Sequence, residues 1–118
     1  MGASFRDLIV WQRAVEMSLA ICGLTASFPS SERYGLTNQL RRAAVSVASN
    51  IAEGYGRLTR GEYLQFLGNA RGSNCEIETQ LVIARSLGFG TAQDAENAER
   101  LCADVSRLLR GLIKSLRP

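Results

Sequence analysis

The spacing of apolar residues constrains the fold of this chain more than any other feature. Through four long segments, apolar residues recur at steps of three and four, the pattern of helices that bury one face. No segment alternates with the two-residue period of a strand. We therefore expect four helices, covering about residues 7–26, 32–55, 60–87 and 92–116.

Each expected helix carries one stripe of residues predicted to face the core. In the first it is Leu8, Trp11, Val15, Ser18, Cys22 and Thr25, with Leu19 beside them. The second has Leu36, Leu40, Ala43, Val47 and Ile51, and the third Tyr63, Phe66, Leu67, Ala70, Ile77, Leu81 and Ala84. The fourth has Leu101, Cys102, Val105, Leu108, Leu109, Leu112, Ile113 and Leu116.

Turn and capping residues separate the four segments. Proline at position 29 disfavours helical geometry in Phe28 and predicts the end of the first helix there. Thr59-x-x-Glu62 predicts a capping box at the start of the third helix. Glycines, which adopt the left-handed conformation that terminates helices, are expected to end two helices. They are Gly54 and Gly56 after the second helix and Gly88 and Gly90 after the third, with Thr91 preceding the fourth.

Short links between long helices determine the expected topology. Links of a few residues force neighbouring helices to run antiparallel. A chain of 118 residues also buries enough surface to form one core without a disulfide or metal. The predicted fold is all-α, a single up-down-up-down antiparallel four-helix bundle that forms one domain over residues 1–118.

The cysteines and the hydropathy of the chain bear on its compartment. Cys22, Cys75 and Cys102 are an odd number without C-x-x-C spacing, and we interpret them as reduced core residues. No apolar run approaches the ~20 residues of a membrane span, and the amino-terminal residues lack the apolar core of a signal peptide. We expect a soluble, cytoplasmic protein that does not contact membranes.

The absence of histidine excludes several classes of enzyme. It removes the usual general base, the usual zinc ligand and every Ser-His or Cys-His nucleophile pair. It also removes the Glu-x-x-His pairs of di-metal bundles. Glu76 and Glu78 are two positions apart and point to different sides of one helix. We expect no catalytic residues, no metal ligands and no cofactor.

Basic residues exceed acidic ones, and nearly all of them are arginine. The net charge is +3, with thirteen arginines and one lysine. Arginine suits phosphate oxygens, but the same bias arises from a GC-rich genome, and the arginines form no block of like charge. The candidates for phosphate contacts are Arg41, Arg57 and Arg60.

A polar stripe runs beside the apolar stripe on the second and third helices. On the second helix it comprises Gln39, Arg42, Ser46, Asn50 and Glu53, and on the third Glu62, Gln65, Asn69, Ser73, Glu76 and Gln80. The sequence leaves three interpretations of these side chains open. They form a half-buried network within the bundle or between subunits, or they form a solvated surface, or they form a binding site for phosphate or a peptide. An ion pair between Arg42 and Glu76 is one expected contact.

Trp11 has two interpretations. It is either an anchor in the core or an interface, or a platform on which a nucleic-acid base stacks.

Several segments resemble a known family. They are Phe5-Arg-Asp-Leu-Ile-Val-Trp-Gln12, Phe28-Pro-x-x-Glu32-x-Tyr34-Gly35-Leu36 and Gln39-Leu-Arg-Arg-Ala-Ala-x-Ser46-x-x-x-Asn50-Ile-Ala-Glu-Gly54, followed by Glu62-Tyr-Leu-Gln-Phe-Leu67, Gly72-Ser73-x-x-Glu76-x-Glu78-x-Gln80-Leu81 and Leu112-Ile-x-Ser-Leu116. The chain thus resembles, over nearly its whole length, the four-helix-bundle proteins associated with intervening sequences in bacterial 23S rRNA genes.

That resemblance implies a cytosolic bundle that assembles into a ring of five. It also implies a relation in fold to the basic accessory proteins of diversity-generating retroelements, which assist a reverse transcriptase and bind nucleic acid. The expected function is that of a non-catalytic, ring-forming homo-oligomer that acts as a scaffold or interaction protein. The alternative is a nucleic-acid-binding accessory protein, since five subunits of +3 sum to about +15.

Overall fold

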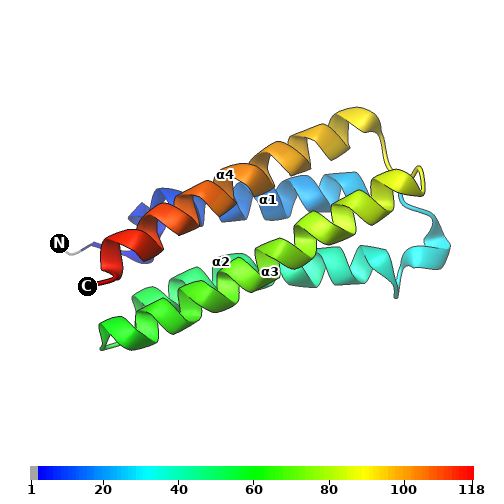
Figure 1. Cartoon of the computed structure of the whole chain (residues 1–118). Coiled ribbons are helices and arrows are strands. Elements are labelled where there is room, and N and C mark those ends of the chain that lie inside the picture. Colours follow the sequence, from blue (N-terminus) through cyan, green and yellow to red (C-terminus); the bar gives the residue numbers. More distant parts are fainter. Residues whose placement is uncertain (1–2) are drawn as a thin grey trace.

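The predicted four-helix bundle is confirmed by a computed structural model that describes residues 3–118 (Figure 1). The helices are α1 (Ile9–Thr25), α2 (Leu36–Tyr55), α3 (Arg60–Ser86) and α4 (Ala92–Leu116). Two short 3-10 helices, η1 (Phe5–Asp7) and η2 (Ser30–Glu32), precede α1 and α2. The described residues contain no strand, and no helix among them is long and apolar enough to cross a membrane.

The helices are arranged as the corners of a square. Helix α2 packs against α1 and α3, and α4 packs against the same two helices. The molecule measures 44 × 23 × 21 Å. Figure 1 shows the α2–α3 link at the same end as the two termini, and the α1–α2 and α3–α4 links at the opposite end.

Local capping explains where three of the helices begin. The Thr59 hydroxyl oxygen accepts a hydrogen bond from the Glu62 backbone N–H at 3.1 Å, and Thr91 does the same for Asp94. The Thr59 capping box is only half formed, because the Glu62 carboxylate accepts from the Thr59 hydroxyl and not from its backbone N–H. Helix α2 begins four residues later than predicted, after a turn in which the Glu32 carboxylate accepts from the Leu36 N–H at 3.1 Å.

The core confirms the apolar stripe of α2 except at Leu36, which is half-buried, and it confirms in part the stripes of α3 and α4. Fully buried members include Leu40, Val47, Leu67, Ile77 and Leu109. Burying each such side chain contributes about 1.5–3 kcal/mol. Tyr63 of α3 and Leu108, Leu112 and Leu116 of α4 are only half-buried and lie at the edge of the core, and Phe66 is also half-buried.

The predicted stripe of α1 was wrong by about one position, except at Thr25, which is buried as predicted. The residues that face the core are Val10, Ala14, Met17, Ile21 and Leu24, together with Thr25. Trp11, Val15 and Ser18 are half-buried, and Leu19 and Cys22 are exposed. Apolar residues occur all round this helix, and one position corresponds to a rotation of about 100°, so two stripes fit the same spacing.

Two of the three cysteines do not belong to the core. Cys22 and Cys75 are exposed and Cys102 is buried, and all three are free thiols. Cys22 was assigned to the core because it belongs to the predicted stripe of α1, which was wrong. Cys75 is the residue directly after the buried Asn74 on α3, so its side chain points away from the core. The interpretation as core residues therefore holds for Cys102 alone.

Helix α2 ends at Gly56 as predicted, but the two glycines do not adopt the left-handed conformation that was expected. Gly54 is a buried residue inside the helix, and neither it nor Gly56 has a positive φ. A Cβ on Gly54 would lie 2.8 Å from the Cβ of Phe66, so glycine is needed there because α3 approaches closely. Gly88 and Gly90 have φ values of 76° and 79°, which confirms the left-handed turn after α3.

Candidate functional site

The polar stripes of α2 and α3 face each other across a groove between these helices. We call it the α2–α3 groove, and it has a volume of about 400 Å³. Its lining comprises Asn38, Gln39, Arg42, Ala43, Ser46, Ser73, Glu76 and Gln80. Six of the eight residues predicted as a polar network therefore line one surface, and the other two, Asn50 and Glu53, lie further along α2.

Two serines join the helices in the middle of the groove. The hydroxyl oxygens of Ser46 and Ser73 are 3.0 Å apart, so one hydroxyl donates to the other. The Asn50 amide donates to the Ser46 backbone carbonyl at 2.8 Å and to the Ser46 hydroxyl at 3.0 Å. Part of the polar stripe thus forms a network within one chain that holds α2 against α3.

A glutamine pair closes one end of the groove. The Gln80 amide donates to the Gln39 side-chain oxygen over a long 3.4 Å. Gln80 is only 9% exposed, and its own side-chain oxygen is buried without a hydrogen-bond partner among the described residues. A buried amide oxygen without a hydrogen bond lowers the stability of the fold by about 1–3 kcal/mol. This end of the groove therefore lacks one hydrogen-bond donor.

The expected ion pair between Arg42 and Glu76 is not formed. Both residues are exposed on the walls of the groove, but no ion pair within residues 3–118 joins them. Solvation explains this outcome, because an exposed pair gains only about 0–1 kcal/mol by closing. The groove therefore presents one cation and one anion to the outside.

The three candidate phosphate contacts do not form one site. Arg57 lies beside the α2–α3 link, where it pairs with Glu53 at 2.9 Å and stacks over the Phe66 ring at 4.5 Å. Arg60 begins α3 at the same end. Arg41 is sixteen residues before Arg57 on the chain, a distance of about 24 Å along a helix. Its Nε donates to the Thr25 hydroxyl at 2.9 Å, next to the α1–α2 link.

Trp11 is half-buried and packs against the edge of the hydrophobic core. Its ring meets that of Phe5 edge to face, with centroids 5.2 Å apart. The side chain thus anchors η1 to α1 within the chain.

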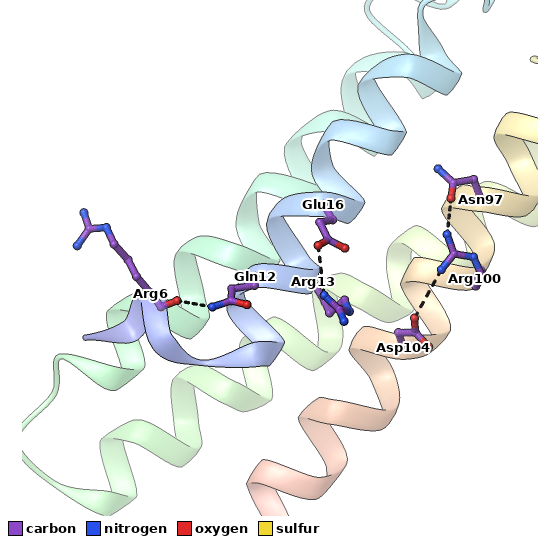
Figure 2. A network of polar contacts seen from close by, with 7 residues as sticks. All are labelled: Arg6, Gln12, Arg13, Glu16, Asn97, Arg100 and Asp104. Atoms are coloured by element: carbon purple, nitrogen blue, oxygen red, sulfur yellow. Dashed lines mark hydrogen bonds and ion pairs between the residues drawn. The ribbon is translucent and has the colours of Figure 1, made fainter. Parts of the chain in front are cut away.

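The charged residues between α1 and α4 pair locally. Figure 2 shows Arg13 bonded to Glu16 on α1, and Arg100 between Asn97 and Asp104 on α4. These arginines contact acceptors on their own helix, at 3.2 Å for Arg13 and 4.0 Å for the Arg100–Asp104 pair. Their charge is therefore partly neutralised, unlike that of the arginines on α2.

Sequence analysis missed a buried polar contact between α3 and α4. Asn74 is 1% exposed, and its amide donates to the Cys102 carbonyl at 3.1 Å, while the Cys102 thiol donates to the Asn74 side-chain oxygen at 3.3 Å. Burial, and then the negative charge of Glu78 and Cys75, raise the pKa of Cys102 to about 12. The sequence does indicate that Asn74 is buried, because it lies between Ala70 and Ile77 at the steps of four and three residues that define the buried stripe of α3.

The described residues contain no group of three or more Cys, Asp, Glu or His side chains that could hold a metal ion.

Comparison with known proteins gives a family match and a matching fold. The model of the family described as 23S rRNA-intervening sequence protein matches residues 6–111. A crystal structure from Bacteroides thetaiotaomicron, of a protein of unknown function from the S23 ribosomal protein family, superimposes with a TM-score of 0.81. It is 20% identical, and the match covers 90% of this chain and 96% of that one. No curated protein matches the chain.

Proposed function

Because the chain belongs to the family of 23S rRNA-intervening sequence proteins, we propose that it acts as a non-catalytic homo-oligomer, assembled as a ring of five, that serves as a scaffold or interaction protein. Its apolar outer surface supports this proposal, as argued below. The lack of histidine supports a non-catalytic role, and the three free thiols support a cytoplasmic location.

The observation that carries this proposal is an apolar surface at the carboxyl-terminal end of α3. Val82, Ile83 and Leu87 are 66%, 46% and 59% exposed. Ile83 and Leu87 are four positions apart and lie on one face of the helix. We call these three residues the α3 patch. Contiguous exposed apolar surface on a helix marks a site that another protein covers, and the proposal takes Ile83 and Leu87, with Val82 beside them, as part of such a surface.

The α2–α3 groove supports assembly through its unused polar groups. Arg42 and Glu76 form no ion pair, and the Gln80 side-chain oxygen has no partner within the described chain. Polar groups from a neighbouring subunit would pair with the exposed side chains of Arg42 and Glu76 and determine its register, whereas the buried Gln80 oxygen lies out of their reach.

Sedimentation velocity of the wild-type chain and of an Ile83→Glu/Leu87→Glu variant tests the proposal. Two carboxylates in the α3 patch would be desolvated in an interface at a cost that assembly cannot recover. We expect the wild-type protein to sediment as a pentamer at micromolar concentration and the variant as a smaller species with an unchanged circular dichroism spectrum.

Leu58→Glu is the matched control. Leu58 is 98% exposed in the α2–α3 link, at the opposite end of the bundle from the α3 patch. The Leu58→Glu variant should sediment like the wild-type protein. A monomeric wild-type chain would contradict the proposal. If Leu58→Glu dissociated the oligomer as much as Ile83→Glu/Leu87→Glu does, the α3 patch would not be a specific part of the interface.

A second candidate function is nucleic-acid binding, favoured by the arginines of α2 and the turn before it. Within residues 3–118, Arg33, Arg41 and Arg42 take part in no ion pair. A ring would repeat these unpaired charges in each subunit and strengthen its field. Oligonucleotide affinity should then fall steeply as salt rises, and an affinity insensitive to salt would contradict this function.

A further inference from the structure

A second groove lies where the α1–α2 link meets the start of α2, beside the cyan turn in Figure 1. We call it the Arg41 groove, and its volume is about 490 Å³. Its lining includes Thr25, Ser30, Arg33, Thr37, Asn38 and Arg41. Apart from Thr25, whose hydroxyl proton is donated to the Ile21 carbonyl, the side chains of these residues can donate a hydrogen bond to a ligand, and no carboxylate lines the groove.

The guanidinium of Arg41 is held in place from the core side. Its Nε donates to the hydroxyl of Thr25, which is 3% exposed and itself donates to the Ile21 carbonyl at 2.7 Å. This contact joins α2 to α1 and leaves the two terminal nitrogens of Arg41 without an acceptor in the described chain. A guanidinium fixed in this way loses little entropy when it binds an anion.

A second guanidinium and the helix end add positive potential to the same groove. Arg33 is exposed and makes no ion pair within residues 3–118. The backbone N–H groups of Thr37 and Asn38 lie in the first turn of α2, and they have no acceptor within the described part of the chain. Free N–H groups at a helix start favour anions.

The one carboxylate of the preceding turn is already engaged. Glu32 accepts the hydrogen bond from the Leu36 N–H at 3.1 Å, and it does not line the groove. The donors of the Arg41 groove therefore face no internal anion that would neutralise them.

From this arrangement we propose that the Arg41 groove binds a phosphate group, which the terminal nitrogens of Arg41 and the guanidinium of Arg33 hold. Phosphate fits better than a carboxylate, because donors come from two arginines, a helix start and the Ser30 hydroxyl, and phosphate offers more acceptor oxygens. The site lies within one chain, so it does not depend on oligomer assembly.

Calorimetric titration with inorganic phosphate, in a phosphate-free buffer at low salt, tests the site. The key comparison is between Arg41→Gln and Arg42→Gln, neighbouring changes that remove the same charge from α2. Arg42 lines the α2–α3 groove and not the Arg41 groove. We expect Arg41→Gln to weaken phosphate binding about tenfold or more and Arg42→Gln to change it less than about twofold.

Two further variants distinguish phosphate binding in the Arg41 groove from non-specific attraction to the positive charge of the protein. Thr25→Val keeps the net charge but removes the acceptor that holds Arg41, and it should weaken binding severalfold. Arg33→Gln changes an exposed residue that makes no ion pair in the described chain, so it should fold normally and also weaken binding. Undetectable phosphate binding by the wild-type chain, or equal losses in the Arg41 and Arg42 variants, would overturn the proposal.

Parallel titrations with adenosine monophosphate and with a single-stranded oligonucleotide identify the source of the phosphate. Binding of the monophosphate that is lost in Arg41→Gln indicates a small phosphorylated molecule. Oligonucleotide binding that inorganic phosphate displaces and Arg41→Gln abolishes indicates a nucleic-acid backbone. Both results support the site, and oligonucleotide binding that phosphate does not displace contradicts its use for nucleic acid.

Discussion

At the scale of single residues, buried polar groups distinguish this bundle from a purely apolar one. Asn74 and Cys102 exchange hydrogen bonds between α3 and α4 in a region that is otherwise apolar. Thr25 connects α1 to Arg41 of α2, and Ser46 connects α2 to Ser73 of α3. Because each contact links two neighbouring helices, these residues specify how the helices align along the bundle.

The buried thiol of Cys102 predicts a loss of stability at alkaline pH. Burial, with the charge of Glu78 and Cys75, raises its pKa from the ordinary 9.0 to about 12. Between these values the unfolded chain releases the thiol proton and the folded chain retains it, so the free energy of unfolding falls as pH rises from 9.0 to about 12. Below pH 9.0 this contribution to stability is fully present.

Urea denaturation of the wild-type chain and of Cys102→Ala at several pH values measures this effect. The pKa of Tyr63 is also raised, by burial and by Tyr55, so both proteins should lose stability in alkali. The wild-type protein should lose more, and the stability difference between the two proteins should narrow above pH 9.0. A constant difference from neutral to alkaline pH would show that Cys102 ionises freely in the folded chain.

At the scale of the helices, the sequence predicted the bounds of each helix to within about two residues, except for the start of α2, but it did not always predict which face is buried. Helix α2 has one apolar face, so Leu40, Val47 and Ile51 were assigned correctly. Helix α1 has two overlapping apolar stripes, and only the position of α2 and α4 beside it determines that Met17 and Ile21 are buried. Spacing alone carries no information about those neighbours.

The candidate site could be predicted in part for the same reason. The spacing of Gln39, Ser46, Ser73 and Gln80 placed them on two helix faces, and the short α2–α3 link brought those faces together. The contact between Thr25 and Arg41 could not be predicted, because it depends on the rotation of α1. Asn74 was missed because only apolar residues were counted in the stripe of α3.

The close approach of α2 and α3 predicts opposite effects of two glycine substitutions. Gly54→Ala would place a Cβ 2.8 Å from Phe66 Cβ and 3.1 Å from the Tyr63 ring, so we expect it to destabilise the bundle by about 1–3 kcal/mol. A Cβ at Gly68 would meet no atom within 4 Å outside its own stretch of helix, so Gly68→Ala should stabilise α3 by about 0.5–1 kcal/mol.

Thermal denaturation of the two variants compares them directly. The Gly68 variant is the control, because both changes introduce the same methyl group into a helix. If Gly54→Ala were as stable as Gly68→Ala, α2 and α3 would not approach each other closely at Gly54.

At the scale of the whole molecule, the two ends of the bundle carry different chemistry. The end with the α1–α2 and α3–α4 links carries the Arg41 groove and the α3 patch. The opposite end carries Arg57, which is already paired with Glu53. In our account, the first end therefore provides both subunit contacts and an anion site, and the α2–α3 groove runs from it along the bundle.

The central claim is that this chain assembles with copies of itself, and native mass spectrometry tests it most directly. One chain has a mass of 12.9 kDa, and our account predicts a dominant species of five times that mass at micromolar concentration. A spectrum that contains only the 12.9 kDa chain at that concentration would contradict the claim.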